Sequence, residues 1–115
     1  MARVVYKHPL VFSALHKRCE VLLPKDSKIL HIHHQKDAHG NYRLFLWAET
    51  NPHWEASEAP TTIRRFFEIY GTGQTIDDIL NSQLHHCKTI CDNPFVWHIY
   101  ERVYDVGHEP HGTPA

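Results

Sequence analysis

The chain has 115 residues, of which 42% are hydrophobic and 22% are charged, so it is long enough for one hydrophobic core and too short for two. Its 12 lysines and arginines nearly balance its 13 aspartates and glutamates, which excludes a dedicated binder of duplex DNA and an acidic mimic of the nucleic-acid backbone. The apolar runs are too short for a membrane helix and the first residues lack the pattern of a secretory signal, so we expect a cytoplasmic protein without membrane association.

Period-2 alternation of apolar and polar residues, interrupted by proline, glycine and asparagine, predicts a series of short strands. The His8-Pro9 pair is expected to end or bend the first strand, because proline cannot donate to a sheet ladder. Six strands follow from this alternation: residues 3–7, 20–23, 28–35, 42–49, 62–70 and 95–102.

The third and fourth of these strands are predicted to form a hairpin, because residues 37–41 supply glycine and asparagine for a turn. Strict alternation divides the third strand into two faces, with Leu30, Ile32 and His34 on one and Ile29, His31 and His33 on the other. The fourth strand is apolar on both faces, which predicts a central position in its sheet.

Residues 75–91 allow two interpretations. Thr75 and Asp78 resemble a capping box and the apolar residues that follow fall at helical spacing, so the segment alone predicts an amphipathic helix. The alternative ends the helix near Ser82 and adds a strand at residues 86–91, which contain β-branched residues. We prefer the alternative, because this strand gives the last one a neighbour.

These elements predict a mainly β fold, an antiparallel β-sandwich or flattened barrel of six or seven strands with one short helix. Residues 1–104 form a single β-rich domain in this interpretation, and residues 105–115, which contain prolines and glycines, form a flexible C-terminal tail. Edge strands of such sheets make a homodimer an expected arrangement as well.

Five motifs span nearly the whole chain as far as Tyr104: YKHPL at residues 6–10, LPKDSKIL at 23–30, LWAE at 46–49, RRFFEIYGTG at 64–73 and FVWHIYE at 95–101. In order and spacing they resemble a family of small bacteriophage and prophage proteins of unknown function. The resemblance implies a phage setting, hence the cytoplasm of an infected bacterium, and a strand before FVWH. It brings no catalytic residues, and the chain departs from the family by a longer insertion with cysteines and histidines before FVWH.

Histidine is the compositional outlier, with 12 in 115 residues. Imidazole and thiolate bind zinc, so one hypothesis is a metal site drawn from His31, His33, His85, His86, Cys87, Cys91 and His98. The spacings typical of zinc sites are absent, and exposed or core-edge histidines are the simpler interpretation, so we predict no bound metal and no cofactor. The odd set of three cysteines, which includes Cys19, predicts reduced and inert thiols rather than a disulfide or a nucleophile.

The Gly71-Thr72-Gly73-Gln74 turn is the candidate ligand-binding site. Its backbone N–H groups offer donors for the phosphate or carboxylate of a cyclic nucleotide or a small anion. The turn is shorter than a Walker loop and lacks the lysine of that motif. The alternative is a glycine turn that only redirects the chain.

Residues 51–60 form the longest predicted loop and the candidate partner-binding surface. Trp54, flanked by His53 and Glu55, lies in a polar stretch, and an exposed tryptophan is a typical interface anchor. The alternative is that its ring folds back over the sheet edge. Most other aromatic residues are expected in the core, because they lie on alternating strands: Phe45, Trp47, Phe66, Phe67, Tyr70, Phe95, Trp97 and Tyr100.

No motif equips the chain for turnover, so we do not expect an enzyme. The phage resemblance and the economy of phage genomes favour an accessory protein that binds a host protein, such as a defence or regulatory component, and inhibits or modulates it. The 51–60 loop and an uncovered sheet face are the expected binding surfaces. Two alternatives stay open: a small-ligand module that captures a nucleotide signal or a metal ion, and a minor virion or assembly component.

Overall fold

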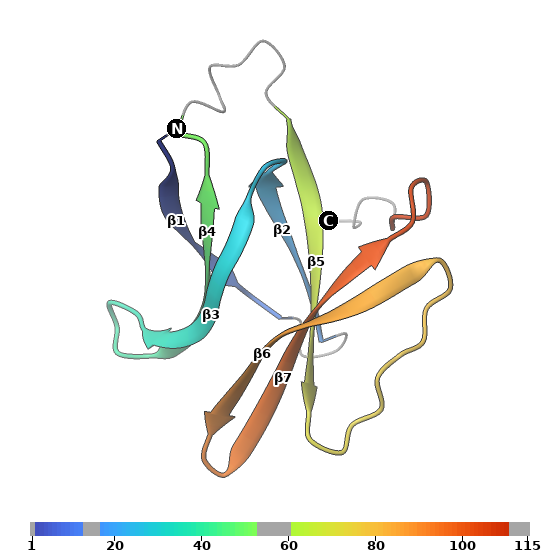
Figure 1. The fold of residues 1–115 in the computed structure, drawn as a ribbon. Helices are drawn as coiled ribbons and strands as arrows, with labels where there is room; N and C mark the ends of the chain where they lie inside the picture. The colour runs from blue at the N-terminus through green and yellow to red at the C-terminus, as the bar shows by residue number, and fades with distance from the viewer. Residues whose placement is uncertain (1, 13–16, 53–60, 111–115) are drawn as a thin grey trace.

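The computed structural model describes residues 2–12, 17–52 and 61–110. These residues form seven strands and no helix, which Figure 1 shows in chain order from blue to red. The strands are β1 Val4–Leu10, β2 Arg18–Pro24, β3 Lys28–Lys36, β4 Tyr42–Thr50, β5 Thr62–Gly71, β6 Ser82–Asp92 and β7 Phe95–Tyr104. Every predicted strand is therefore present, close to its expected position.

The strands form two antiparallel sheets that pack face to face. The three-stranded sheet has the order β1-β4-β3, and the four-stranded sheet has the order β2-β5-β7-β6. In Figure 1 the three-stranded sheet lies at the left, and the β6–β7 hairpin extends toward the bottom of the view. The predicted antiparallel sandwich is confirmed, and the described strands do not close into a barrel.

The hydrophobic core lies between the two sheets, where alternate residues of each strand point inward. Leu46 of β4, Phe67 of β5 and Ile99 of β7 are 0% exposed, and Ile32 of β3 and Ile90 of β6 are 2% exposed. Burying one such side chain contributes about 1.5–3 kcal/mol relative to leaving it exposed. The predicted central position of β4 is confirmed, since β4 pairs with β1 on one side and with β3 on the other.

A β-bulge in β3 overturns the strict alternation expected there. The register against β4 shifts between Ile29 and His31, so Leu30 is an extra residue in the strand. Ile29 therefore packs against the core together with the buried Ile32, whereas Leu30 is 45% exposed. Beyond the bulge the alternation resumes, and His31 and His33 are both exposed.

Residues 72–81 contain no helical turn and lead directly into β6, so the short helix predicted after the glycine turn is absent. Asn81 has a positive φ of 59°, a left-handed conformation that ends a helix rather than continuing it. The Asp77 carbonyl accepts a hydrogen bond from the Arg102 side chain at 2.7 Å, so contacts with the sheet decide the path of this segment. The competing strand is confirmed and begins earlier than expected, at Ser82.

Strand β1 continues through Pro9 to Leu10 instead of ending at the His8-Pro9 pair. It is an edge strand of its sheet, and an edge tolerates proline because one side of the strand needs no N–H donor. The prediction was therefore wrong about where this strand ends, although the pairing rule behind it is respected.

Candidate functional site

The outer side of the three-stranded sheet carries a set of aromatic and basic side chains. We call it the aromatic face and define it as Lys7, His31, His33, Phe45 and Trp47. The pairing register aligns Trp47 of β4 with Lys7 of β1 and His31 of β3, and it aligns Phe45 with His33. These positions alternate with the core residues of the same strands, so their side chains point away from the core. Figure 1 shows no described strand stacked on this side of β4.

The side chains of the aromatic face contact one another. The ring centroids of Phe45 and Trp47 lie 6.3 Å apart, and those of His31 and Trp47 lie 5.7 Å apart. The Lys7 Nζ lies 4.5 Å from the centre of the Phe45 ring, a cation–π distance. Phe45 and Trp47 are half-buried, and the three other residues are exposed. The face thus has an aromatic centre with basic groups around it.

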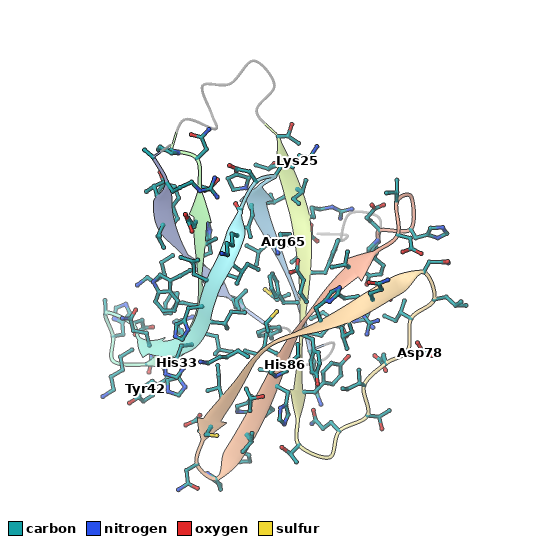
Figure 2. The ribbon with its side chains drawn as sticks, in the orientation of Figure 1. Lys25, His33, Tyr42, Arg65, Asp78 and His86 are labelled. Atoms are coloured by element: carbon teal, nitrogen blue, oxygen red, sulfur yellow. The ribbon has the colours of Figure 1, made fainter. Side chains whose placement is uncertain are left out.

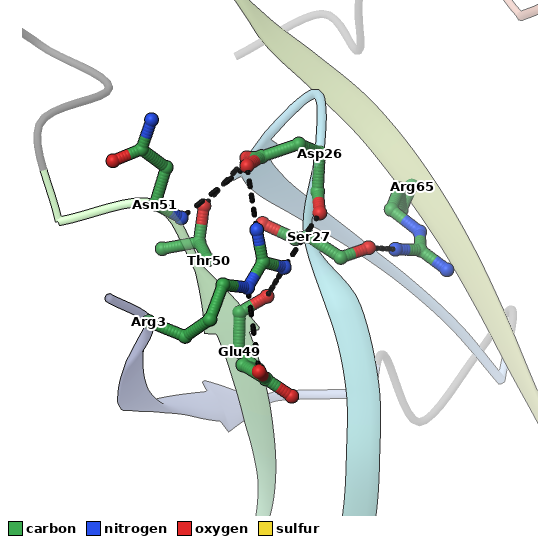
Figure 3. Close-up of polar contacts among 7 residues, drawn as sticks. All are labelled: Arg3, Asp26, Ser27, Glu49, Thr50, Asn51 and Arg65. Carbon is green, nitrogen blue, oxygen red and sulfur yellow. Dashed lines mark hydrogen bonds and ion pairs between the residues drawn. The ribbon is translucent and has the colours of Figure 1, made fainter. Parts of the chain in front are cut away.

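A hydrogen-bonded cluster around Asp26 holds the end of β4 beside this face (Figure 3). The Thr50 hydroxyl donates to Asp26 Oδ1 at 2.7 Å, and the Asn51 N–H donates to Oδ2 at 3.3 Å. Arg3 lies 3.1 Å from Asp26 and 3.3 Å from the Glu49 carboxylate. The hydrogen bond from Thr50, followed by those from Asn51 and Arg3, lowers the pKa of the Asp26 carboxyl. The cluster therefore ties the first strand, the β2–β3 turn and the end of β4 together.

The predicted partner-binding residues His53, Trp54 and Glu55 lie outside the described residues, so their role stays a prediction. They follow the Asp26 cluster directly in the sequence. The aromatic residues assigned to the core divide into several groups. Phe67 and Tyr70 are buried, whereas Phe95 is 60% exposed. The rest are half-buried: Phe45, Trp47, Phe66, Trp97 and Tyr100.

Sequence reasoning missed the aromatic face because it treated β4 as apolar on both sides. One side of a strand in a two-layer sandwich must be the outer side, and that side held Phe45 and Trp47. The signal in the sequence was the small residue Ala48, which lies between Trp47 and Glu49. In the structure Ala48 faces inward and is 1% exposed, whereas Trp47 and Glu49 are half-buried. Lys7 carried no signal at all, since its place over Phe45 depends on strand pairing.

The outer side of the four-stranded sheet holds a buried ion pair beneath residues 72–81. Glu68 is 1% exposed and Arg102 is 3% exposed, and the two side chains bond through Arg102 Nε and at 2.9 Å through Nη2. The Tyr70 hydroxyl donates to Glu68, and Arg102 Nη1 donates to the Ser82 hydroxyl at 2.9 Å. Burial acts to raise the pKa of Glu68, but the hydrogen bonds from Arg102 and Tyr70 outweigh it and lower the pKa. With its charges satisfied inside the protein, this pair has a structural role.

Most backbone donors of the predicted ligand turn are already used inside the protein. Gly71 N–H donates to the Gln74 side chain at 2.8 Å, and Gln74 N–H returns a bond to Gly71 at 3.1 Å. Thr72 N–H donates to the Val96 carbonyl at 3.3 Å. Gly73 has a φ of 88°, which only glycine adopts without strain. The turn is thus self-contained, and anion binding at Gly71, Thr72, Gly73 and Gln74 stays a prediction.

The histidines and cysteines of the metal hypothesis lie in separate parts of the sandwich. In Figure 2, His33 lies on β3 and His86 on β6. His86 and His98 both hydrogen-bond to the Thr89 hydroxyl, at 2.8 and 3.0 Å, and His98 reaches the Thr72 hydroxyl at 3.0 Å. His85 and Cys91 are exposed, and burial raises the pKa of the Cys87 thiol. Over residues 2–12, 17–52 and 61–110, no group of three or more histidine, cysteine or acidic residues could hold a metal ion.

The two sheets leave a hollow of about 300 Å³ at one end of the sandwich. Its apolar lining comes from both sheets, with Leu44 on one side and Ile69, Ile90 and Trp97 on the other. A second hollow of about 610 Å³ lies on the four-stranded sheet beside Phe66 and Tyr104. Protein sites for small molecules usually have volumes of roughly 300–1,000 Å³, so both hollows fall within that range.

A family model described as "Domain of unknown function (DUF7352)" matches residues 1–109. Searches of curated proteins and of solved structures found no match. No helix long and apolar enough to cross a membrane occurs in the part of the chain that the structure describes. The predicted resemblance is therefore supported at the level of a family of unknown function, and the phage setting stays a prediction.

Proposed function

The chain belongs to the DUF7352 family, and we propose that it is a non-enzymatic binding protein that docks a protein partner on the aromatic face. The observation that carries this proposal is the contact of Phe45 with Trp47 at 6.3 Å on a sheet side that no described strand covers. Tryptophan at the centre of a surface patch is among the residues that contribute most to protein–protein binding.

The surroundings of the aromatic pair favour the same function. Protein interfaces have an apolar and aromatic centre with a polar rim, and here Lys7, His31 and His33 surround the aromatic pair. The face lies on the central strand of its sheet, and the Asp26 cluster holds the end of that strand. A surface fixed in this way loses little conformational entropy on binding.

The proposed partner is a host protein of an infected bacterium, such as a defence or regulatory component, which this chain inhibits or modulates by occupying it. The support for this setting is the resemblance of the five motifs to phage and prophage proteins. A second copy of the chain, paired through an edge strand, is the competing partner.

The proposal is tested by affinity capture with the full chain and two matched variants. Trp47→Ala removes the centre of the aromatic face, and Trp97→Ala removes a half-buried tryptophan from the other sheet. We expect a bacterial host protein to be retained by the wild type and by Trp97→Ala but not by Trp47→Ala. Circular dichroism of both variants is the control that they keep the β fold. Equal retention by all three proteins would contradict docking on this face.

A small-ligand function is the second candidate, because the hollow between the sheets is lined both by apolar residues and by polar groups, including His34, Arg43 and Asp92. A ligand that enters this hollow would bridge the two sheets and raise the melting temperature. Thermal-shift measurements with cyclic nucleotides and with zinc distinguish the candidates: a shift that Trp97→Ala abolishes supports the ligand function. An unchanged melting temperature with all of these probes would contradict the ligand function.

A further inference from the structure

The four outermost strands of the sandwich decide whether it can bind by strand addition. Among the described residues, β1 and β3 are the edges of the three-stranded sheet, and β2 and β6 are the edges of the four-stranded sheet. An edge strand carries unpaired backbone N–H and C=O groups, which can pair with a second copy of the chain or with an extended segment of a partner. Each of the four strands is therefore a possible binding site unless something in it blocks pairing.

Strand β1 contains a proline. Pro9 pairs with Phe45 of β4, and a proline within an edge strand places its missing N–H on the free side of that strand. An added strand would therefore lose a hydrogen bond at this position. In full antiparallel overlap, two copies of β1 would also place Lys7 opposite Lys7, and like charges directly opposite each other are destabilising.

Strand β3 contains the bulge at Leu30 and has a lysine at each end. The bulge interrupts the regular spacing of backbone groups, so a straight strand cannot pair in register along the whole edge. Lys28 and Lys36 are both exposed. Two copies of β3 in full antiparallel overlap would bring Lys28 of one copy opposite Lys36 of the other. Strand β3 thus combines two features that oppose pairing.

Strand β6 contains a second bulge. Its register against β7 shifts between His86 and Lys88, so Cys87 is the extra residue. Cys87 packs against the hydrophobic core, which holds the bulge in place. Lys88 follows directly and adds a positive charge to the same strand. The middle of this edge is therefore irregular as well.

Strand β2 is bounded at both ends. Lys17, which precedes it, has a φ of 53°, a left-handed conformation that interrupts extended backbone, and Pro24 ends the strand. The free edge of β2 also lies near β1, since Cα atoms of the two strands approach within 8 Å of each other. The same holds for β3 and β6. The edges of opposite sheets thus partly cover one another on both sides of the sandwich.

We infer that all four edges are closed to strand addition, so that the chain is a monomer in solution and a protein partner binds it with a folded surface laid on a sheet face. Four separate strands each carry a feature that opposes pairing, which is the pattern of edges that must stay unpaired. The monomeric state is independent of the proposed function and excludes its competing partner, a second copy. The statement about the partner rests on the proposed function and adds that this partner is not an extended segment.

The test measures the mass of the full chain in solution by light scattering, from micromolar to millimolar concentrations. Two variants open an edge: Pro9→Val restores an N–H on β1, and deletion of Leu30 removes the extra residue of β3. Without Leu30, Ile29 and His31 still point to opposite sides and match their partners on β4, so the deletion is compatible with the fold. We expect the wild type to keep the monomer mass at every concentration, and both variants to reach about twice that mass at the highest ones.

Two matched control variants leave the edges unchanged. Leu30→Ala shortens an exposed side chain but retains the bulge, and Pro110→Val replaces an exposed proline outside the strands. Both should remain monomeric, like the wild type. Circular dichroism shows whether each variant keeps the β fold, and Pro9→Val still tests the inference if the deletion variant does not fold.

Three results would overturn the inference. The first is a dimer of the wild-type chain. The second is that the folded edge variants stay monomeric, since the proline and the bulge would then not be what keeps the edges unpaired. The third is a complex with a captured host protein in which amide hydrogen exchange slows at the free-edge amides of β1, β2, β3 or β6.

The outcomes also separate this inference from the proposed function. Slower exchange at an edge leaves docking on the aromatic face in place if Trp47→Ala still loses the same host protein. Failure to capture any host protein removes the proposed function but leaves the monomer measurement, which contains no host protein, as it stands.

Discussion

The outer sides of the two sheets differ in how far other parts of the chain cover them. On the four-stranded sheet, residues 72–81 cover Glu68, Tyr70 and Arg102, and the Asp77 carbonyl accepts a hydrogen bond from Arg102. On the three-stranded sheet, His31 and His33 stay exposed beside Trp47. One side therefore satisfies its polar groups with the chain's own backbone. The other leaves histidines exposed beside a half-buried tryptophan.

The largest effect should come from breaking the buried ion pair. Arg102→Leu leaves Glu68 buried without its cation and removes the bonds to Ser82 and Asp77. We expect the free energy of unfolding to fall by about 3–5 kcal/mol, measured by urea denaturation. Arg18→Leu is the control: Arg18 pairs with Asp77 at 3.4 Å with half-exposed side chains, and its loss should cost less than about 1 kcal/mol. Equal losses in the two variants would mean that burial of Glu68 adds nothing.

A smaller effect is expected from removing only the hydroxyl that Tyr70 donates to Glu68. Tyr70→Phe keeps the buried ring, which is 6% exposed, and leaves one carboxylate oxygen with one donor fewer. Hydrogen bonds to charged groups contribute roughly 1.5–3 kcal/mol, and Arg102 still bonds to the same oxygen, so we expect a loss near the lower end of that range. An unchanged urea midpoint would show that the hydroxyl is not part of this network.

Truncating the aromatic face should cost less stability again. Trp47 is half-buried on the outer side of β4, so Trp47→Ala exposes no core residue directly and should lower the free energy of unfolding by about 1 kcal/mol. The same measurement is a control for the capture experiment, because it shows whether Trp47→Ala destabilises the fold. If Trp47→Ala destabilised the fold as much as Arg102→Leu does, the aromatic face would be a structural layer and not a surface kept for a partner.

The smallest effect is a pH dependence that separates the two sides. The pKa of His33 is lowered from 6.5 in the folded chain, so the unfolded chain binds its proton at higher pH and stability falls as the pH drops below about 6.5. The pKa of Glu68 is lowered from 4.5, so its contribution is retained until the pH falls below about 4.5. Urea midpoints from neutral pH to about pH 5 should decline slightly in the wild type and less in His33→Gln. Identical declines would place the first titration elsewhere, for instance at His8, whose pKa burial also lowers.

The strands could be predicted because their signals are local. Alternation and turn residues identified six of the seven, and the β-branched residues before Asp92 correctly favoured a strand over a long helix for the other one. The bulge at Leu30 and the path of residues 72–81 could not be predicted in the same way. They depend on pairing with β4 and on a hydrogen bond from Arg102, which lies far away in the sequence. At both places, tertiary contacts outweighed the structure that the local sequence favours.

The candidate site was harder to predict than the fold. His31 and His33 were correctly placed together on one side of β3, but in a metal hypothesis that separated them from Trp47. Phe45 and Trp47 looked like core residues because alternation shows which residues share a side and not which side faces inward. Nothing in the sequence singled out Glu68 and Arg102, since their burial depends on contacts such as that of Arg102 with the Asp77 carbonyl. Burial and pairing across the sheet therefore carried the information that was missing.

The Asp26 cluster has a consequence for any shortened or fused form of this protein. Arg3 is the cation that pairs with both Asp26 and Glu49, and it lies two residues after Met1. Deleting the chain through Arg3 would leave both carboxylates without their cation, and Asp26 would keep only the hydrogen bonds from Thr50 and Asn51. A truncated protein would therefore carry one more unit of negative charge at this end of the three-stranded sheet.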